Sequence, residues 1–284
     1  MLFVKNELLN MQNKTLRFLF LGDIVGEPGK ALFEKWVPQL KRKHKIDSVI
    51  VNGENAAKNG RGLMPHDFEF LKKNGASVVT TGNHIWAHKK IYQCIAENET
   101  LIRPANYPAG APGKGYVLFD VEGISVGVIN VAGRVFMKED LDCPFRAVES
   151  LLTFLSTKTK IIFIDFHAEA TSEKKVFGFH FDGKVSGVMG THTHVQTADE
   201  RILPNGTSFI SDLGFSGAMN SALGVNKSIV TEHFLTQMPI AFKVAKEGPF
   251  AVNGVCVEVD VETGKSLKIE RVSIVDDELT ILSE

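Results

Sequence analysis

Five apolar segments of strand length each end in side chains that can ligate a metal ion. The endings are Gly22-Asp23, residues 52–55 (Asn-Gly-Glu-Asn), residues 82–84 (Gly-Asn-His), His167, and residues 191–194 (Thr-His-Thr-His). The carboxyl ends of strands in an open α/β sheet converge on one crevice, so we expect a single polar pocket rather than five separate sites. Carboxylate, amide and imidazole ligands together suit divalent metal ions of hard to borderline character. The pattern therefore predicts a site for a pair of such ions.

The two histidines of the last ending, His192 and His194, give the most specific of these signals. In an extended segment, side chains two residues apart point to the same side, so both imidazoles would face one site while Thr191 would point away. Histidine is a common metal ligand, yet an isolated pair with this spacing is more often not a metal site. Its occurrence together with His167 and the acidic and amide strand endings favours metal binding over a packing role.

Taken in chain order, these motifs resemble those of the calcineurin-like metallophosphoesterase superfamily, whose signature runs DxH, GD, GNH, H and GHxH. Longer stretches resemble the YmdB-like phosphodiesterase branch: GDIVG from Gly22, NGENAA from Asn52, TGNHIW from Thr81, HAEATSEK from His167 and GTHTHVQTAD from Gly190. The resemblance covers residues 16–275. Val25 replaces the histidine of DxH and Glu54 replaces the aspartate of GD, and both replacements are usual in the YmdB-like branch.

The resemblance implies how the candidate ligands are divided between two divalent metal ions. One ion would be held by Asp23, Glu54 and His194, and the other by Asn83, His167 and His192. Glu54 would bridge the pair, because two cations about 3.5–4 Å apart need a shared anionic ligand. The loss of the DxH histidine would leave one ion with fewer protein ligands. Oxygen and nitrogen ligands without thiolate favour Fe or Mn over Mg or Zn and argue against a structural zinc site.

The same resemblance implies hydrolysis of small phosphodiesters, with 2′,3′-cyclic nucleotides as the class that the family suggests. A metal-bound hydroxide would attack phosphorus, His84 would protonate the leaving alkoxide as general acid, and Asn55 would donate hydrogen bonds to a phosphate oxygen. One alternative is a phosphomonoesterase or phosphoprotein phosphatase that uses the same metals. Another is a non-catalytic, metal-dependent regulator that binds nucleotide or RNA, for which an acid such as His84 would be unnecessary.

Composition narrows the class of protein further. The 284-residue chain is 44% hydrophobic and 23% charged, as expected for a globular protein with a substantial core. A net charge of -1 argues against electrostatic binding of long RNA or of an anionic membrane, whereas bound metals can attract a small phosphate ester. Three scattered cysteines, no bilayer-length apolar run and no signal-peptide pattern indicate a cytoplasmic protein. Whether it forms a homo-oligomer stays open.

Strand and helix signals alternate over the first two-thirds of the chain, and β-hairpins are added later. Expected strands span 16–22, 47–52, 77–81, 160–166, 185–190 and 207–211; expected helices follow Pro28 and span 65–74, 86–98, 144–156 and 172–180; expected hairpins span 115–130 and 250–275; expected loops span 104–115 and 214–224. The pattern predicts an α/β fold, namely a two-sheet mixed β-sandwich flanked by helices, which is the four-layer arrangement of metallophosphoesterases. Residues 1–15 would form an N-terminal arm and residues 16–284 a single domain, since any boundary would divide the site.

Other polar residues near the motifs have ordinary alternative roles. Asp165 shares a strand face with His167 and is expected to be structural or to lie behind the ligands, and Asp199 and Asp212 could orient ligand histidines. Glu169 could line the cavity. The remaining histidines are expected on the surface or in packing roles: His44, His66, His88, His180 and His233.

Overall fold

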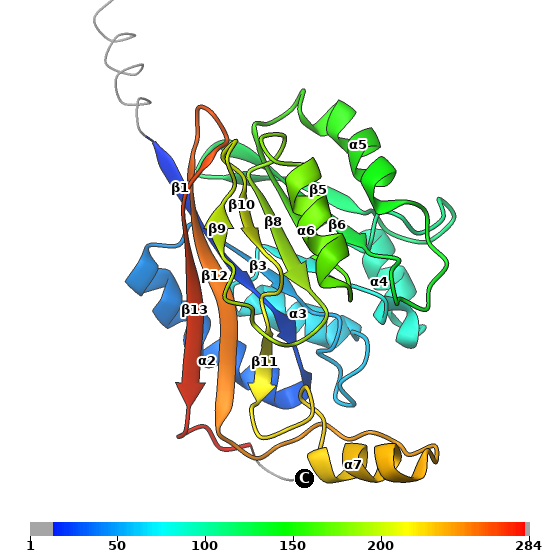
Figure 1. The fold of residues 1–284 in the computed structure, drawn as a ribbon. Coiled ribbons are helices and arrows are strands. Elements are labelled where there is room, and N and C mark those ends of the chain that lie inside the picture. Colours follow the sequence, from blue (N-terminus) through cyan, green and yellow to red (C-terminus); the bar gives the residue numbers. More distant parts are fainter. Residues whose placement is uncertain (1–13, 282–284) are drawn as a thin grey trace, which may run out of the picture.

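The computed structural model describes residues 14–281, in which two β-sheets pack face to face and helices cover both outer sides (Figure 1). The predicted α/β fold, a two-sheet mixed sandwich flanked by helices, is confirmed. Most of the expected N-terminal arm lies outside the described residues, and the first strand begins at Thr15. No helix in the described range is long and apolar enough to cross a membrane.

The first sheet has seven strands in the order β2-β11-β12-β1-β3-β4, with β13 on the other edge of β12. Its strands are β1 (Thr15–Leu21), β2 (Asp23–Ile24), β3 (Ser48–Asn52), β4 (Val78–Thr80), β11 (Phe215–Ala218), β12 (Phe250–Asp260) and β13 (Ser266–Asp276). Strands β1, β3 and β4 run parallel, so their carboxyl ends meet at one edge. Strands β1 and β11 lie end to end along β12, which places Gly214 beside Asp23.

The second sheet has six strands in the order β5-β6-β7-β8-β10-β9. Its strands are β5 (Tyr116–Val121), β6 (Ile124–Ala132), β7 (Ile161–His167), β8 (Gly187–Thr191), β9 (Arg201–Ile202) and β10 (Ser208–Ile210). The central strands β6, β7, β8 and β10 are parallel, and the two edge strands are antiparallel. Both expected hairpins, β5–β6 and β12–β13, are present.

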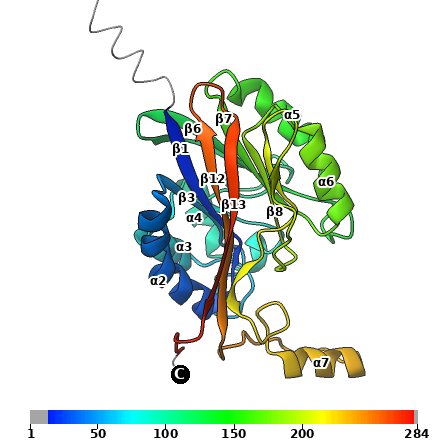
Figure 2. The same cartoon turned by 60° about the vertical axis from the view of Figure 1, so that its left-hand side comes forward.

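Helices form the two outer layers (Figure 2). The first sheet is covered by α2 (Gly26–His44), α3 (Pro65–Lys73), the 3-10 turn η1 (Ile85–Ala87) and α4 (Ile91–Glu97), and the second by α5 (Pro144–Leu155) and α6 (Thr171–His180). The expected helix over 86–98 is thus split, with residues 88–90 between its parts. A last helix, α7 (Lys227–Thr236), extends away from the sheets and buries none of its residues.

Apolar residues at alternate positions join the layers. In β1, Phe18 and Phe20 face the second sheet, whereas Leu19 and Leu21 face the helices, as the two-residue period of a strand requires. The Phe163 ring lies 4.7 Å from that of Phe18 and 4.8 Å from that of Phe20. Burial of each such ring stabilises the fold by about 1.5–3 kcal/mol. The aromatic cluster thereby packs the two sheets against each other.

The prediction of a loop over residues 214–224 is partly wrong. Residues Phe215–Ala218 form the buried strand β11, which pairs with β12 and β2. Its small residues look like a flexible loop in sequence, but Gly217 has the Phe215 ring within 2.8 Å of where a Cβ would stand. Small side chains are therefore required here by close packing. The helix α7 that follows was not expected, because its apolar residues form no buried face.

Candidate metal centre

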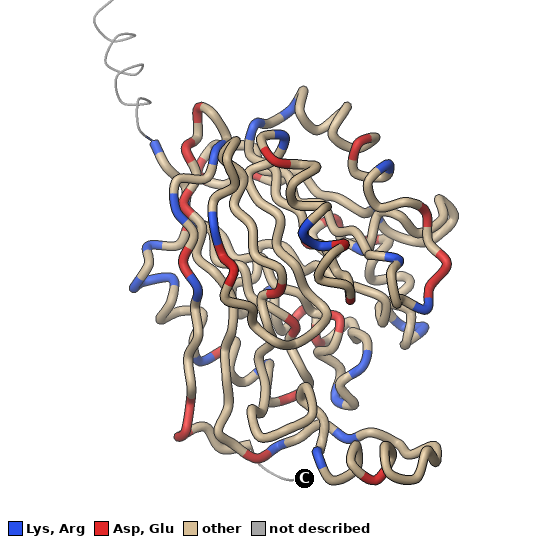
Figure 3. The backbone as a smooth tube through the Cα atoms, in the orientation of Figure 1, with Lys and Arg blue, Asp and Glu red and all other residues tan. Residues whose placement is uncertain are grey.

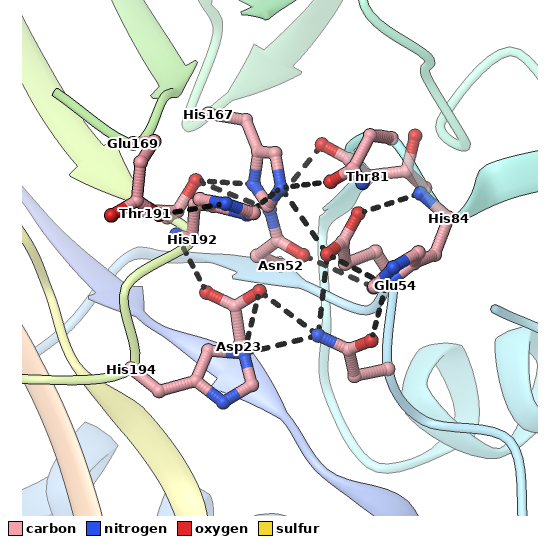
Figure 4. A network of polar contacts seen from close by, with 12 residues as sticks. Asp23, Asn52, Glu54, Thr81, His84, His167, Glu169, Thr191, His192 and His194 are labelled. Carbon is pink, nitrogen blue, oxygen red and sulfur yellow. Dashed lines mark hydrogen bonds and ion pairs between the residues drawn. The ribbon is translucent and has the colours of Figure 1, made fainter. Parts of the chain in front are cut away.

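The predicted site residues lie together between the carboxyl edges of the two sheets (Figure 4). The first sheet contributes the oxygen-bearing side chains, from the start of β2 and the ends of β3 and β4: Asp23, Glu54, Asn55 and Asn83. The second sheet contributes three imidazoles, from the ends of β7 and β8: His167, His192 and His194. The five strand ends therefore converge on one cluster of polar side chains.

The residues predicted for the first ion surround one small region. His194 Nε2 lies 3.5 Å from Asp23 Oδ1. The amide nitrogen of Asn55 lies 3.1 Å from His194 Nε2, 3.4 Å from Asp23 Oδ1 and 3.2 Å from Glu54 Oε1. One atom therefore touches all three side chains expected at this position.

The residues predicted for the second ion are equally close. Glu54, His167 and His192 offer ligand atoms that all lie within 4.8 Å of one another. His167 Nε2 is 3.2 Å from Glu54 Oε1, 3.0 Å from His192 Nδ1 and 3.1 Å from the amide oxygen of Asn83. Glu54 Oε1 belongs to both groups, which is the placement that a bridging carboxylate needs.

A buried relay determines which nitrogen of His167 carries a proton. The Thr191 hydroxyl donates to Asp165 Oδ1 at 2.6 Å, and its oxygen lies 3.0 Å from His167 Nδ1. Because a hydroxyl has only one proton to give, Thr191 must accept a hydrogen bond from Nδ1–H. The Asp165 carboxylate also accepts from Asn52 Nδ2 at 3.0 Å and from the Thr80 hydroxyl. In its neutral form, His167 thus keeps its proton on Nδ1 and presents an unprotonated Nε2 to the site.

The other two imidazoles are oriented in the same sense. His192 Nε2 lies 3.1 Å from a Glu169 carboxylate oxygen, and His194 Nδ1 lies 2.9 Å from the Leu223 carbonyl oxygen. Both partners are acceptors, so in the neutral rings these outer nitrogens carry the proton and the inner nitrogens have free lone pairs. Three lone pairs directed at two carboxylates make a donor set that fits divalent cations.

The electrostatics of the site point to a cation as well. Burial would raise the pKa of both Asp23 and Glu54, but His194 beside the first and His167 beside the second hold each pKa below its usual range. Burial would lower the pKa of His167, but Glu54 outweighs it and raises that pKa to about 9. Burial and the neighbouring His167 lower the pKa of His192 to about 3. Without a metal, the proton is therefore favoured on His167 and disfavoured on His192, whose Nδ1 lies 3.0 Å from His167 Nε2.

Gly82 is needed for close approach at the centre. A Cβ at this position would lie 2.2 Å from Glu54 Oε2 and 2.3 Å from His167 Nε2. Any side chain there would displace two candidate ligands, which explains why glycine precedes Asn83 and His84.

The expected extended conformation of residues 191–194 is wrong. Strand β8 ends at Thr191, and His192 and His194 have positive φ angles of 102° and 60°. Thr191 does not point away from the site but supports His167. The bend is fixed by Asp212, whose Oδ2 accepts from Thr193 N at 3.0 Å and from the buried Lys174 ammonium at 2.7 Å. Periodicity alone could not reveal a turn stabilised by residues from two distant elements.

The remaining expectations are met in part. Asp165 lies behind a ligand, as expected, and so does Asp212. Asp199 bonds to Ser211 and Thr197 and has no contact with a ligand histidine. The five remaining histidines make contacts outside the ligand cluster or are exposed: His44, His66, His88, His180 and His233.

Two contributors were not found from the sequence. The Leu223 carbonyl supports His194, but a backbone oxygen leaves no mark in the sequence. Tyr107, in the expected loop, has a buried hydroxyl with no hydrogen-bond partner among the described residues. Burial and the charges of Glu139 and Glu54 raise its pKa.

Comparison with known proteins identifies the family. The family model described as "YmdB-like protein" matches residues 19–272. The chain belongs to the YmdB-like family. A YmdB-like relative from Bacillus subtilis, named 2′,3′-cyclic-nucleotide 2′-phosphodiesterase, is 46% identical over 264 residues, which cover 93% of this chain and 99% of that protein.

Solved structures of similar proteins agree with the fold. A phosphatase from Mycoplasma pneumoniae superposes with a TM-score of 0.87 at 36% identity, covering 93% of this chain and 95% of that one. A hypothetical protein from Thermus thermophilus gives a TM-score of 0.84 at 38% identity, covering 92% and 100%. A putative 5′-nucleotidase from Staphylococcus aureus, with a TM-score of 0.62 at 16% identity over 95% of this chain and 56% of its own, shares the fold alone.

Proposed function

We propose that this YmdB-like protein is a dinuclear-metal phosphodiesterase that hydrolyses 2′,3′-cyclic nucleotides. The observation that carries the proposal is the position of Glu54, which is shared by two ligand groups and lies beside His84. The substrate class is supported by the name of the B. subtilis relative, which this chain resembles over nearly its whole length. The three cysteines are free, in keeping with a cytoplasmic location.

Two divalent cations, Fe or Mn by ligand type, would be held by the six residues in the two groups. One would be held by Asp23, Glu54 and His194, and the other by Asn83, His167 and His192, with Glu54 shared. When bound, such cations neutralise phosphoryl charge and lower the pKa of water toward 7, which supplies the nucleophile.

His84 is suited to give a proton to the leaving oxygen. Its ring is 28% exposed, against 20% for His192, 11% for His194 and 0% for His167, so it is the imidazole most open to a substrate. Its Nδ1 lies 3.0 Å from the Asn55 amide oxygen and 3.4 Å from Glu54 Oε1. These acceptors hold Nδ1–H and leave Nε2 to transfer a proton.

Asn55 links the acid to the first ligand group. Its amide oxygen accepts from His84, while its amide nitrogen faces Asp23, Glu54 and His194. A phosphate oxygen drawn to this group would meet the amide hydrogens. We therefore assign Asn55 two tasks, which are to bind that oxygen and to orient His84.

A second candidate function is phosphomonoester hydrolysis at the same site. It is favoured by the M. pneumoniae relative, 36% identical over 276 residues that cover 95% of this chain and 97% of that protein and named putative phosphatase/phosphodiesterase. A monoester and a cyclic diester present similar phosphoryl oxygens to the ligands. The two activities differ in the leaving group, so substrate comparison separates them.

The test combines metal analysis with assays on 2′,3′-cyclic AMP, p-nitrophenyl phosphate and a phosphopeptide. For Asn83→Ala we expect loss of bound metal and of activity. For His84→Ala we expect retained metal and a fall in diesterase kcat of about 10²–10⁴-fold. A protein that binds no Mn or Fe, or that hydrolyses none of these substrates after reconstitution with either metal, would refute the proposal.

A further inference from the structure

A groove of about 690 Å³ lies beside the metal centre, and none of the functions assigned so far uses it. We call it the basic groove. Its lining comes from the β3–α3 loop, from His88 after η1 and from the segment between α7 and β12: Ala57, Lys58, Asn59, Met64, His66, His88, Phe242, Lys243, Val244 and Lys246. Figure 3 shows Lys and Arg positions in blue on the β3–α3 loop and on the segment after α7, toward the lower right of the view.

The groove is contiguous with the site through two short stretches of chain. Ala57 follows Asn55 by two residues, so their Cα atoms are at most about 7 Å apart; His88 follows His84 by four, at most about 14 Å. The stretches also touch each other. A Cβ on Gly62 would lie 3.2 Å from the His84 carbonyl oxygen and 2.9 Å from the His88 ring, and His88 Nε2 bonds to the Arg61 carbonyl at 2.9 Å.

The charge of the groove differs from that of the whole chain. Three lysines and two histidines line it, and none of the described lining residues is acidic, although the chain carries a net charge of -1. Asp67, which contacts His66, is fully buried and paired with Lys30. An aromatic side chain, Phe242, belongs to the same lining and is 48% exposed. The groove therefore combines the positive charge of three lysines with an exposed aromatic ring.

Cations that follow a backbone, combined with an exposed aromatic ring, are the features by which proteins hold single-stranded nucleic acid. We propose that the basic groove binds the RNA chain that precedes a terminal 2′,3′-cyclic phosphate. The enzyme would then act on short RNA fragments as well as on free cyclic mononucleotides. This inference rests on the proposed function.

The chemistry is the hydrolysis already assigned to the centre. One water adds to phosphorus, the P–O2′ bond breaks, and the O2′ atom takes its proton from His84, which leaves a 3′-phosphomonoester. A terminal 2′,3′-cyclic phosphate requires a 2′-hydroxyl, so the polymer is RNA rather than DNA. Because the groove begins at most about 7–14 Å from Asn55 and His84, the nucleotides directly before the terminal phosphate would be the ones to meet it.

The experiment compares kcat/KM for 2′,3′-cyclic AMP with that for oligoribonucleotides of two to six residues that end in a 2′,3′-cyclic phosphate. We expect kcat/KM to rise with length and to level off within this series, once the groove is filled. Lys243→Ala/Lys246→Ala should reduce the tetranucleotide value about tenfold or more and reduce the slope of log kcat/KM against log salt by about 1.4, since each lost phosphate contact removes about 0.7. Phe242→Ala should cost about tenfold on the tetranucleotide.

Controls separate the groove from general effects. Each groove variant should keep the 2′,3′-cyclic AMP value within about twofold, as should Lys73→Ala, which removes an exposed lysine of α3 outside the groove lining. Equal losses on mononucleotide and oligonucleotide, or no gain with length and no loss in the groove variants, would overturn the inference.

Two further outcomes distinguish a failure of the RNA-binding inference from a failure of the proposed function. If wild type hydrolyses neither substrate, the proposed function fails, and anisotropy of a labelled tetranucleotide on wild type and the double lysine variant still measures the groove. If polyglutamate displaces that probe as well as unlabelled RNA of equal charge, the groove is a general polyanion surface and the inference is wrong.

Discussion

His167 contacts Glu54 and His194 contacts Asp23 in the metal centre, but different kinds of structure hold the two imidazoles. His167 is fully buried, and its outer nitrogen is held through Thr191 by Asp165. His194 is held by the carbonyl oxygen of Leu223, a residue that is 50% exposed and has a positive φ of 56°. The second ligand group is therefore preorganised by a buried network, whereas the first depends on a surface loop.

Removing each histidine in turn should give the largest difference in bound metal between the two ligand groups. For His167→Ala we expect loss of both metals and a fall in diesterase kcat of about 10³-fold or more, because its Nε2 contacts Glu54, the ligand common to both groups. For His194→Ala we expect about one metal equivalent to remain, since the buried group is intact. Metal counting on both purified variants checks this, and equal metal loss would contradict the difference.

Removing the support behind His167 should have a smaller effect. For Asp165→Asn we expect metal affinity to fall about 10–100-fold, as is usual when the partner of a ligating histidine is disturbed. Asp199→Asn is the matched control, because Asp199 also accepts from hydroxyl groups but its threonine, Thr197, contacts no ligand histidine, whereas Thr191 contacts His167. Titration of the metal-free proteins with Mn²⁺ measures both. A control that weakens binding as much as Asp165→Asn would show that the relay has no special role.

The pH dependence of metal binding tests whether His167 is protonated in the metal-free protein. The pKa of His167 is raised to about 9, so below that pH the metal-free centre holds a proton that a cation must displace. Binding near pH 7 should release about one proton, and apparent affinity should rise about tenfold per pH unit until it levels off above pH 9. Calorimetry in buffers of different ionisation enthalpy counts that proton. Equal affinity at pH 7 and pH 9 would exclude this protonation state.

The surface loop can be disturbed with the smallest change. Gly224 has a φ of +91°, and a Cβ there would lie 2.6 Å from a Val25 methyl, so Gly224→Ala should displace the neighbouring Leu223 carbonyl. We expect a loss of a few-fold in affinity for one metal equivalent and none for the other. Gly123→Ala is the control, since its φ of +81° is equally unfavourable but no heavy atom lies within 4 Å of the added Cβ. Both should lose about 1 kcal/mol of stability, and only the first should affect metal binding.

The same contrast explains how much the sequence could predict. Strand endings such as Asp23 and His167 were predictable, because apolar periodicity locates strands and the topology of parallel strands places their ends together. The bend at His192 was not, since it depends on Asp212 and the buried Lys174, which lie 20 and 18 residues away along the chain. Strand β11 was missed because its small residues are required by tertiary packing, which leaves no periodic signal.

The division of ligands between the sheets has a further consequence for the whole fold. Oxygen ligands come from one sheet and imidazoles from the other, so each bound cation would link the two sheets through its ligands. A ligand present at 100 times its dissociation constant stabilises the native state by about 2.7 kcal/mol. Chelation should therefore lower the melting temperature as well as abolish turnover, so a cell short of the metal would hold a less stable protein as well as an inactive one.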